Sequence, residues 1–220
     1  MAATAATAQA QEQLRPGSLQ APSRVAELTF GTGYVQDAGQ LMPTQRLLDA
    51  AGSGFGFVGS IDYRLRPRWS LGVHGEWDEL TARGDQGART LSSTAGVTFH
   101  ARPRTNGDPW VRLGTGYRMF SEANRDTILV HAFEVARLTL GYDFRTDSQV
   151  AFSPVVGADV DLFDWQYAYA DHALNSFARP QVGAFFFAGM QARIDLGAPT
   201  PPRHAAATGS DGAAPSVEVR

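Results

Sequence analysis

Two adjacent stretches decide the fold: residues 53–65, which read SGFGFVGSIDYRL, and residues 68–80, which read RWSLGVHGEWDEL. In the first stretch, aromatic and aliphatic residues occupy one parity, while glycine, serine and charged residues occupy the other, with Val58 as the apolar exception. The second stretch alternates in the same way. Because successive side chains of a strand point to opposite faces, each stretch predicts a two-faced strand. Arg66 and Pro67 between them predict a tight hairpin.

The same alternation recurs along the chain and predicts eight strands. They are expected at residues 26–36, 53–65, 68–80, 89–101, 109–120, 128–145, 149–164 and 180–196. Glu134 lies on the apolar parity of its strand, which predicts a bulge there or a strand that begins beyond a membrane. Pro154 predicts a second bulge, because proline cannot donate a hydrogen bond to a sheet ladder.

The composition fits one domain with two flanking segments. The chain has 220 residues, a net charge of −3 and no cysteine, so nothing indicates a nucleic-acid partner and no disulfide can form. Its longest strongly apolar stretch, residues 182–190, is too short for a membrane helix. Residues 1–25 predict a disordered arm, in which Ala-Gln-Ala at 8–10 resembles the end of a signal peptide without the apolar segment that normally precedes it. Residues 26–197 are expected to form a barrel and residues 198–220 a disordered tail rich in proline and alanine.

Eight strands with up-and-down connections predict a closed antiparallel barrel without free edges. Residues 37–52 are expected to form a long loop with a short helical turn at 43–49, and residues 165–179 an aromatic-rich loop. Connections after the second, fourth and sixth strands are expected to be short, and most of the others longer. Outer-membrane barrels combine short periplasmic turns with longer outside loops, so this contrast predicts that both termini are periplasmic.

The aromatic residues decide between a membrane barrel, a soluble lipocalin-like barrel and a β-sandwich. Small and aliphatic residues fill the middle of the apolar face, and aromatic residues lie near both ends of it. One belt comprises Tyr63, Trp69, Phe99, Tyr142, Phe144 and Phe152, and the other comprises Tyr34, Phe55, Trp77 and Tyr117. Two belts around an aliphatic band are typical of a lipid-facing surface and favour an eight-stranded transmembrane β-barrel.

Residues 26–196 resemble the small OmpA/OmpX-type outer-membrane barrels in their alternation and connection lengths. The resemblance implies a monomer in the bacterial outer membrane, with membrane lipid and lipopolysaccharide as partners and a surface ligand held by the loops. Such barrels often end on an aromatic residue that helps their assembly, whereas the last predicted strand here ends Ile194-Asp195-Leu196. The tail is also too short to fold into a peptidoglycan-binding domain.

Closing the barrel turns a set of acids, arginines and histidines inward. This interior set comprises Glu27, Asp62, Arg64, His74, Glu76, Asp78, His100, Arg112, Arg118, Arg137, Asp143, Asp159, Asp161, Arg193 and Asp195. An eight-stranded barrel has room for little more than its own side chains, and buried charges must be paired. We therefore expect an ion-pair network that replaces an apolar core and makes the barrel rigid. The alternative is a narrow gated pore.

Arg137→Ala tests this expectation. Removal of the guanidinium group leaves a buried carboxylate unpaired, so the variant is expected to unfold at lower denaturant concentration than the parent protein. Unchanged unfolding in both detergent and lipid would rule out the network as a stabilising feature.

Several sequence patterns that carry chemistry elsewhere are better explained by the barrel. Residues 54–59 match the dinucleotide pattern GxGxxG but lie inside a strand rather than between a strand and a helix. His74, Glu76 and Asp78 share a face and could bind a metal ion, but ion pairing in the lumen explains them better. We predict no cofactor and no metal ion.

Hydrolase residue types occur near the predicted outer rim: Ser121, Asp126 and His131, then Asp171 and His172. These types co-occur by chance in most loops, so no catalytic residue is assigned. A lipid-modifying enzyme, such as a lipid A deacylase or acyltransferase, remains the alternative from a different class, and a narrow small-solute channel is the other alternative.

The aromatic-rich segment is the best candidate for a specific contact surface. Trp165, Tyr167, Tyr169 and Phe177 cluster there, and exposed aromatic residues often mark contact surfaces. A strand extension with Trp165 in the aromatic belt explains the same residues. The sequence therefore predicts a porin-like structural protein of the cell envelope, or one that interacts through its surface loops.

Overall fold

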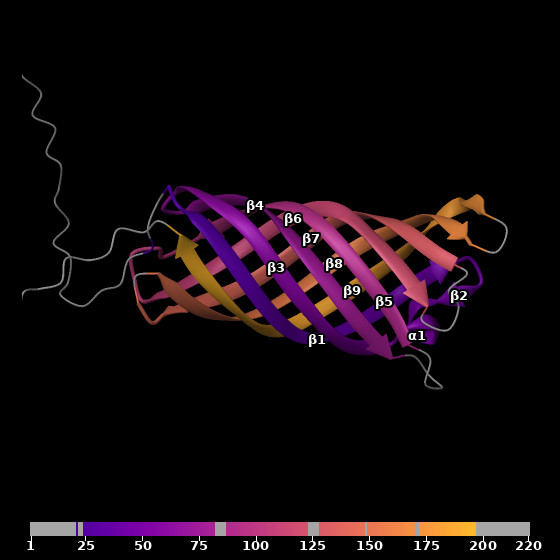
Figure 1. Cartoon of the computed structure of the whole chain (residues 1–220), viewed down its shortest axis with the longest axis horizontal. Coiled ribbons are helices and arrows are strands. Elements are labelled where there is room, and N and C mark those ends of the chain that lie inside the picture. The colour runs from indigo at the N-terminus through magenta and orange to yellow at the C-terminus, as the bar shows by residue number, and fades with distance from the viewer. Residues whose placement is uncertain are drawn as a thin grey trace, which may run out of the picture.

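The computed structural model of the chain describes residue 21 and residues 24–81, 87–122, 128–147, 149–169 and 172–196. Eight long strands dominate it: β1 (Ala26–Met42), β3 (Ser53–Arg66), β4 (Trp69–Thr81), β5 (Gly87–His100), β6 (Gly107–Glu122), β7 (Ile128–Arg145), β8 (Val150–Ala168) and β9 (Ala173–Leu196). Each strand pairs with its sequence neighbour, and β1 also pairs with β9, so the sheet closes (Figure 1). The predicted eight-stranded antiparallel up-and-down barrel is confirmed.

The barrel has two different ends. Turns join β3 to β4, β5 to β6 and β7 to β8 at one end, where β1 begins and β9 finishes, and we call this the turn end (left in Figure 1). At the opposite end, the loop end, the two-residue strand β2 (Gln45–Arg46) pairs with the last part of β1, and the one-turn helix α1 (Leu47–Ala50) follows it. Among the described residues, no helix is long and apolar enough to cross a membrane.

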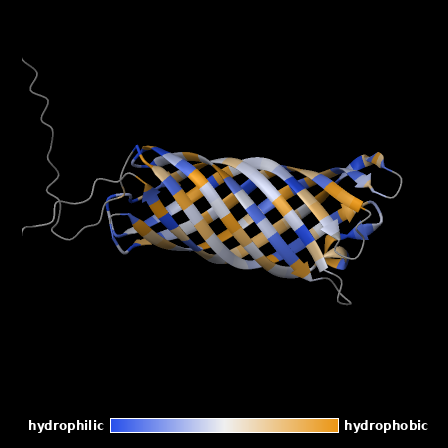
Figure 2. Ribbon diagram, viewed as in Figure 1, coloured by the Kyte–Doolittle hydropathy of each residue, from blue (hydrophilic) through white to orange (hydrophobic). Residues whose placement is uncertain are grey.

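The two faces of the sheet have opposite chemistry. Large apolar side chains point outward on all eight long strands, for example Ile61, which is 66% exposed, and Leu113, which is 61% exposed. Charged side chains such as Arg64 and Asp161 are fully buried inside the barrel. Figure 2 shows the resulting alternation of hydrophobic and hydrophilic residues along the strands. Val58, the exception noted in the first stretch, lies inside and is buried.

The predicted boundaries at the loop end are wrong, because the strands continue further than their alternation does. β1 extends to Met42, β8 extends to Ala168 and β9 begins at Ala173, so most of the segment predicted as an aromatic-rich loop is a β-hairpin. The predicted contrast in connection length holds only in part. Residues 101–106 join β5 to β6 at the turn end, whereas only residues 169–172 join β8 to β9 at the loop end.

The bulge predicted at Glu134 is confirmed. The register of β7 shifts between Glu134 and Ala136 against β8, and β6 shows the matching shift on the other side. One extra residue in β7 moves Glu134 from the apolar parity to the interior, where it is fully buried. The bulge predicted at Pro154 is wrong: Pro154 keeps its register opposite Met190 and lies on the outer face.

The loop-end part of the interior is mainly apolar, although Asp37 is also buried there. A buried cluster, which we call the apolar plug, contains Val35, Leu41, Leu47, Ala50, Ala51, Leu80, Ala88, Phe120, Val130, Ala132, Phe163 and Phe185. Helix α1 contributes Leu47 and Ala50 to it, so the segment between β1 and β3 folds back into the mouth of the barrel. The expectation that ion pairs replace an apolar core along the whole barrel is therefore wrong for this end.

Residues just before β1 pack against the turn end. The N–H of Ala21 donates to the carbonyl of Pro103 over 2.8 Å, and the N–H of Arg24 donates to the carbonyl of Arg64 over 2.8 Å. Ala21 and Val25 are buried. The rest of the predicted N-terminal arm and the whole predicted C-terminal tail lie outside the described residues.

Candidate functional site

Arg118 on β6 is the centre of the charged interior. Its guanidinium group is fully buried and lies 2.8 Å from Asp159, 3.0 Å from Asp161 and 3.1 Å from Asp78. Glu134 and Glu76 complete the surroundings at 3.7 and 4.0 Å, and the ring of Phe185 lies 4.0 Å from the guanidinium carbon. One arginine thus joins side chains from β4, β7, β8 and β9 across the interior.

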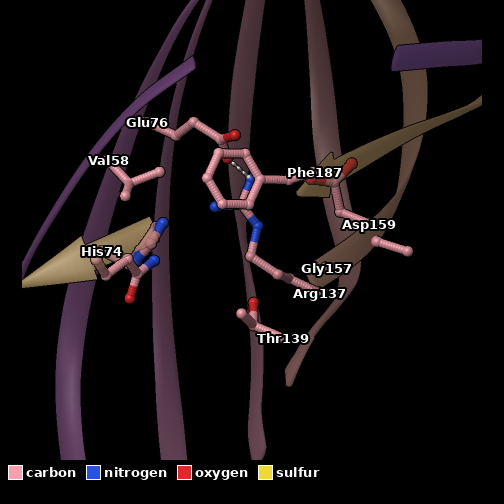
Figure 3. Close-up of a pocket in the computed structure, with 10 residues that line it drawn as sticks. Val58, His74, Glu76, Arg137, Thr139, Gly157, Asp159 and Phe187 are labelled. Carbon is pink, nitrogen blue, oxygen red and sulfur yellow. Dashed lines mark hydrogen bonds and ion pairs between the residues drawn. The ribbon is translucent and has the colours of Figure 1, made fainter. Parts of the chain in front are cut away.

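Arg137 on β7 is the second cation of this cluster. It donates to Asp159 over 2.8 Å and also to Glu76 (Figure 3). Its Nε atom lies 3.1 Å from Glu134. Arg118 and Arg137 share the same Asp159 oxygen. All 19 Lys and Arg residues of the chain are arginine, and the planar guanidinium group suits them to such branched contacts better than an ammonium group would.

Arg112 on β6 links the middle of the barrel. It donates to Asp62 on β3 over 2.6 Å and to Thr98 on β5 over 2.9 Å, and it lies 3.1 Å from Nδ1 of His74 on β4. The hydroxyl of Ser60 donates to the same Asp62 oxygen. This layer therefore joins four strands through one guanidinium group.

Two further groups lie towards the turn end. In the first, Arg64 binds Glu27 and lies 3.3 Å from His100, whose other ring nitrogen is 2.8 Å from Asp108. In the second, Asp143 accepts hydrogen bonds from Trp110, Arg193 and Ser153, and Arg145 donates to Asp195 over 2.7 Å. The structure thus places all 14 acids, arginines and histidine of the predicted network, together with His100, inside the barrel and buried.

Sequence reasoning missed several interior residues, four of which belong to the network or contact it. Glu134 is moved inward by the bulge, Asp108 precedes the predicted start of its strand, and Arg145 is the last residue of its strand. Phe185 lies on the inward parity of β9 between Gly183 and Phe187, so the period-two pattern contained the signal. The three charged residues sit where the pattern ends or changes phase, and alternation is uninformative there.

A small cavity lies beside Arg137 at mid-barrel. Val58, His74, Glu76, Asp159 and Phe187 are among its lining residues (Figure 3), and its volume is about 20 Å³. That is room for roughly one water molecule. Space of this size can hydrate a buried charge, but it does not form a continuous aqueous path.

The structure separates the residues in which a metal site was considered. His74 contacts Arg112, Glu76 contacts Arg137 and Asp78 contacts Arg118. Among the described residues, His100, Asp108 and Asp143 do have ligand atoms within 4.8 Å of one another. Each already bonds to a protein group, so these contacts account for the cluster as part of the ion-pair network.

No hydrolase triad is assembled within the described residues. The ring of His131 hydrogen-bonds to the hydroxyl of Tyr117 and stacks on Trp165, with ring centroids 4.4 Å apart. His172 hydrogen-bonds to Tyr167 over 3.1 Å. Asp126 and Asp171 lie outside the described residues, and neither imidazole contacts a described serine or carboxylate.

The predicted contact residues divide into three groups. Trp165 belongs to the outward row with His131 and Tyr117. Tyr167 and Tyr169 meet edge to face at the tip of the β8–β9 hairpin, with ring centroids 4.9 Å apart. Phe177 is partly buried against the apolar plug, so it supports the hairpin rather than forming part of its exposed surface.

Comparisons with known proteins establish the fold. No family model and no curated protein sequence matches the chain. Among solved structures, it is similar to Neisserial surface protein A, at 10% sequence identity and a TM-score of 0.54, over 78% of this chain and 97% of that one. It is also similar to the outer membrane protein OprG from Pseudomonas aeruginosa, at 13% identity and a TM-score of 0.50, over 80% and 99% of the two chains. The chain therefore has the fold of the small eight-stranded outer-membrane β-barrels.

Gly183→Ile tests the packing of the apolar plug. A Cβ atom at Gly183 would lie 2.5 Å from Leu47 and 2.6 Å from Phe163, so overpacking is expected to lower the free energy of unfolding by about 1–3 kcal/mol. Gly59→Ile is the matched control, because a Cβ there meets only the carbonyl of Thr29 at 3.8 Å. Denaturant titration in detergent measures both variants. Equal stability of the two would show that α1 does not pack at the position described.

Proposed function

We propose that this protein is an integral β-barrel of the bacterial outer membrane, sealed inside, with a structural or surface-interaction role carried by its loop end. The main observation behind the proposal is that apolar side chains lie outside and charged side chains inside, the reverse of a water-soluble globular protein. Large apolar side chains cover the outside, and among the described residues eleven acids and six arginines are buried within. Such a surface suits acyl chains, whereas water-soluble monomers rarely expose contiguous apolar patches of this extent.

The aromatic residues on the outer face support a bilayer location. Towards the turn end, Trp69 packs on Phe99 and Tyr142 packs on Phe144, with ring centroids 4.9 and 4.8 Å apart. Near the loop end, Tyr117 lies in a row with His131 and Trp165. Aromatic side chains favour the two membrane–water interfaces, so these groups fit the edges of an apolar band.

The contents of the interior favour a sealed barrel over a channel. The ion-pair network joins the strands from the turn end to mid-barrel, and the apolar plug fills the loop end. An ion on this path would have to displace Arg118 or Arg137 and then pass through the buried plug. A lipid-modifying activity gains no support either, since His131 and His172, the described histidines near the loop end, hydrogen-bond to tyrosines.

The β8–β9 hairpin is the proposed contact surface. It continues past the point where the other strands turn, and Figure 1 shows it projecting at the loop end. Tyr169 is 48% exposed and Leu174 is 58% exposed. Outer-membrane barrels carry their longer extensions outside the cell, and the β8–β9 hairpin is such an extension, so we propose that the loop end faces outside.

The experiment combines location, orientation and conductance. The protein is expected to fractionate with the outer membrane, to migrate faster on gels before boiling than after, and to give no channel currents in planar bilayers. Because the chain has no cysteine, Tyr169→Cys introduces a single thiol at the hairpin tip. Thr105→Cys, in the β5–β6 turn, is the matched control for the opposite end.

A membrane-impermeant maleimide is expected to label Tyr169→Cys on intact cells, and to label Thr105→Cys only after lysis. Labelling of the turn end alone would reverse the proposed orientation. Recovery of monomeric protein in buffer without detergent would overturn the membrane assignment itself.

A further inference from the structure

At the turn end there is a groove whose charged lining residues are all positive. Its lining residues come from the β3–β4 and β5–β6 turns, and its volume is about 590 Å³. There are nine of them, including Arg66, Arg68, Trp69, Arg102 and Arg104. Four of the nine are arginines and none is acidic.

The backbone of this groove is held in place by hydrogen bonds. The carbonyl of Arg68 accepts from the N–H of His100 over 2.9 Å, which ties the two turns together. The N–H of Arg102 donates to the buried carboxylate of Asp108 over 2.7 Å. Pro103 is buried beneath and accepts from Ala21. The groove is therefore a fixed concave surface from which exposed arginine side chains project.

Three of the groove's arginines lack a counter-charge among the described residues. Arg66, Arg68 and Arg102 are exposed, and no carboxylate of the described residues forms an ion pair with any of them. Elsewhere on the surface, the exposed Arg89 does pair, with Glu79 at 3.1 Å. A concentration of unpaired guanidinium groups attracts an anion, and their geometry suits a phosphate in particular.

The groove also adjoins the apolar outer face. Trp69 lines the groove, is 45% exposed and packs on Phe99 of the neighbouring strand. Leu65, just before Arg66 in β3, is exposed on the same outer face. A ligand with a phosphate head and acyl chains would place the head among the arginines and the chains along these apolar side chains.

We propose that this groove binds the headgroup of an anionic phospholipid, such as phosphatidylglycerol, in the leaflet at the turn end. The proposal rests on the membrane location proposed above. Charge complementarity and continuity with the lipid-facing surface together single out this occupant. A soluble phosphate compound would use the arginines but would leave the apolar border without a role.

The test uses the full chain refolded into phosphatidylcholine bilayers that contain a minor fraction of phosphatidylglycerol. After mild extraction, native mass spectrometry measures how much of each lipid stays bound. The parent protein is expected to retain phosphatidylglycerol in preference to phosphatidylcholine. The double variant Arg68→Gln with Arg102→Gln is expected to lose about 30-fold in that preference, from two surface arginines.

Two matched variants complete the design. Arg46→Gln with Arg179→Gln removes two exposed arginines of the loop end and is expected to leave the preference unchanged. Arg68→Lys with Arg102→Lys keeps the charge and is expected to retain most of the preference. The proposal is overturned if Arg68→Gln with Arg102→Gln keeps the parent protein's preference for phosphatidylglycerol, or if the two double glutamine variants lose that preference equally. It is also overturned if inorganic phosphate displaces the lipid at a concentration comparable to that of the lipid.

Failure of the membrane assignment would look different. A protein that is not a membrane barrel would fail to enter the bilayer and would show no shift in gel mobility on boiling. A barrel that inserts normally but holds both lipids equally would overturn the lipid site alone.

Discussion

Arg118→Met is expected to lower the free energy of unfolding by about 3–5 kcal/mol, because it leaves several buried carboxylates without their cation. The side chain is fully buried, and Asp78, Asp159 and Asp161 lie within 3.1 Å of it. Methionine keeps much of the volume, so the packing against Phe185 changes less than the charge does. The effect should therefore report on the ion pairs rather than on a new cavity.

Arg89→Met is the matched control for Arg118→Met. Arg89 also forms an ion pair, with Glu79 at 3.1 Å, but both side chains are about half exposed. Exposed pairs contribute at most about 1 kcal/mol, so this variant is expected to unfold close to the parent protein. Urea titration of the refolded protein, followed by tryptophan fluorescence, measures both variants on one scale.

A second substitution separates charge from size. Asp161→Asn in the Arg118→Met background removes one of the carboxylates left unpaired, so it is expected to recover part of the lost stability. The same substitution in the parent protein removes a partner of Arg118 and is expected to destabilise it. If Arg118→Met unfolds like Arg89→Met, the buried network does not stabilise the barrel.

The period-two pattern predicted most of the side chains that point into the barrel. It could do so because each strand of a membrane barrel has one face in contact with lipid and the other in the interior. Alternation from Phe55 to Tyr63, or from Trp69 to Asp78, leaves a single consistent assignment of faces. Glu134 shows the limit of this reasoning. Its position signalled a bulge, but only the register of β6 and β8 against β7 shows that the extra residue turns its carboxylate inward, beside Arg137.

The strand ends and the hairpin at the loop end could not be predicted from the sequence, for a different physical reason. Beyond the apolar band, a hairpin can expose both faces, and Leu174, Asn175 and Ser176 all do. No alternation is then required, so a continuing strand resembles a loop in sequence. The apolar plug was hidden as well. Leu47 and Phe163 are distant in sequence and meet only because α1 folds back into the barrel mouth.

The ion-pair network and the apolar plug stabilise the barrel in different ways. The ion-pair network joins distant strands through guanidinium groups that each reach several partners, whereas the plug excludes water through close apolar contacts. Arg118 is where the two meet, because Phe185 belongs to the plug and lies against its guanidinium group. The apolar side of this contact lowers the local polarity around the charges, which strengthens each ion pair and makes an unpaired charge more unfavourable.

Leu138→Arg is the second substitution with a large expected effect, and it tests which side of the sheet faces lipid. Leu138 lies near the middle of β7, opposite Leu113 and Ala158 on the neighbouring strands, and its side chain is 42% exposed on the outer face. An arginine facing lipid at the bilayer midplane destabilises an outer-membrane barrel by about 2–4 kcal/mol. We expect a loss of that size when unfolding is measured in phospholipid vesicles.

Leu196→Arg is the control that makes this result specific to depth. Leu196 ends β9 at the turn end and is 45% exposed, so its exposure matches that of Leu138. Near an interface the same substitution destabilises by only about 0–1 kcal/mol. A barrel surrounded by water would treat both positions alike, because each would place an arginine in solvent. Equal stability of the two variants would therefore place the apolar face in water and remove the physical basis for a membrane protein.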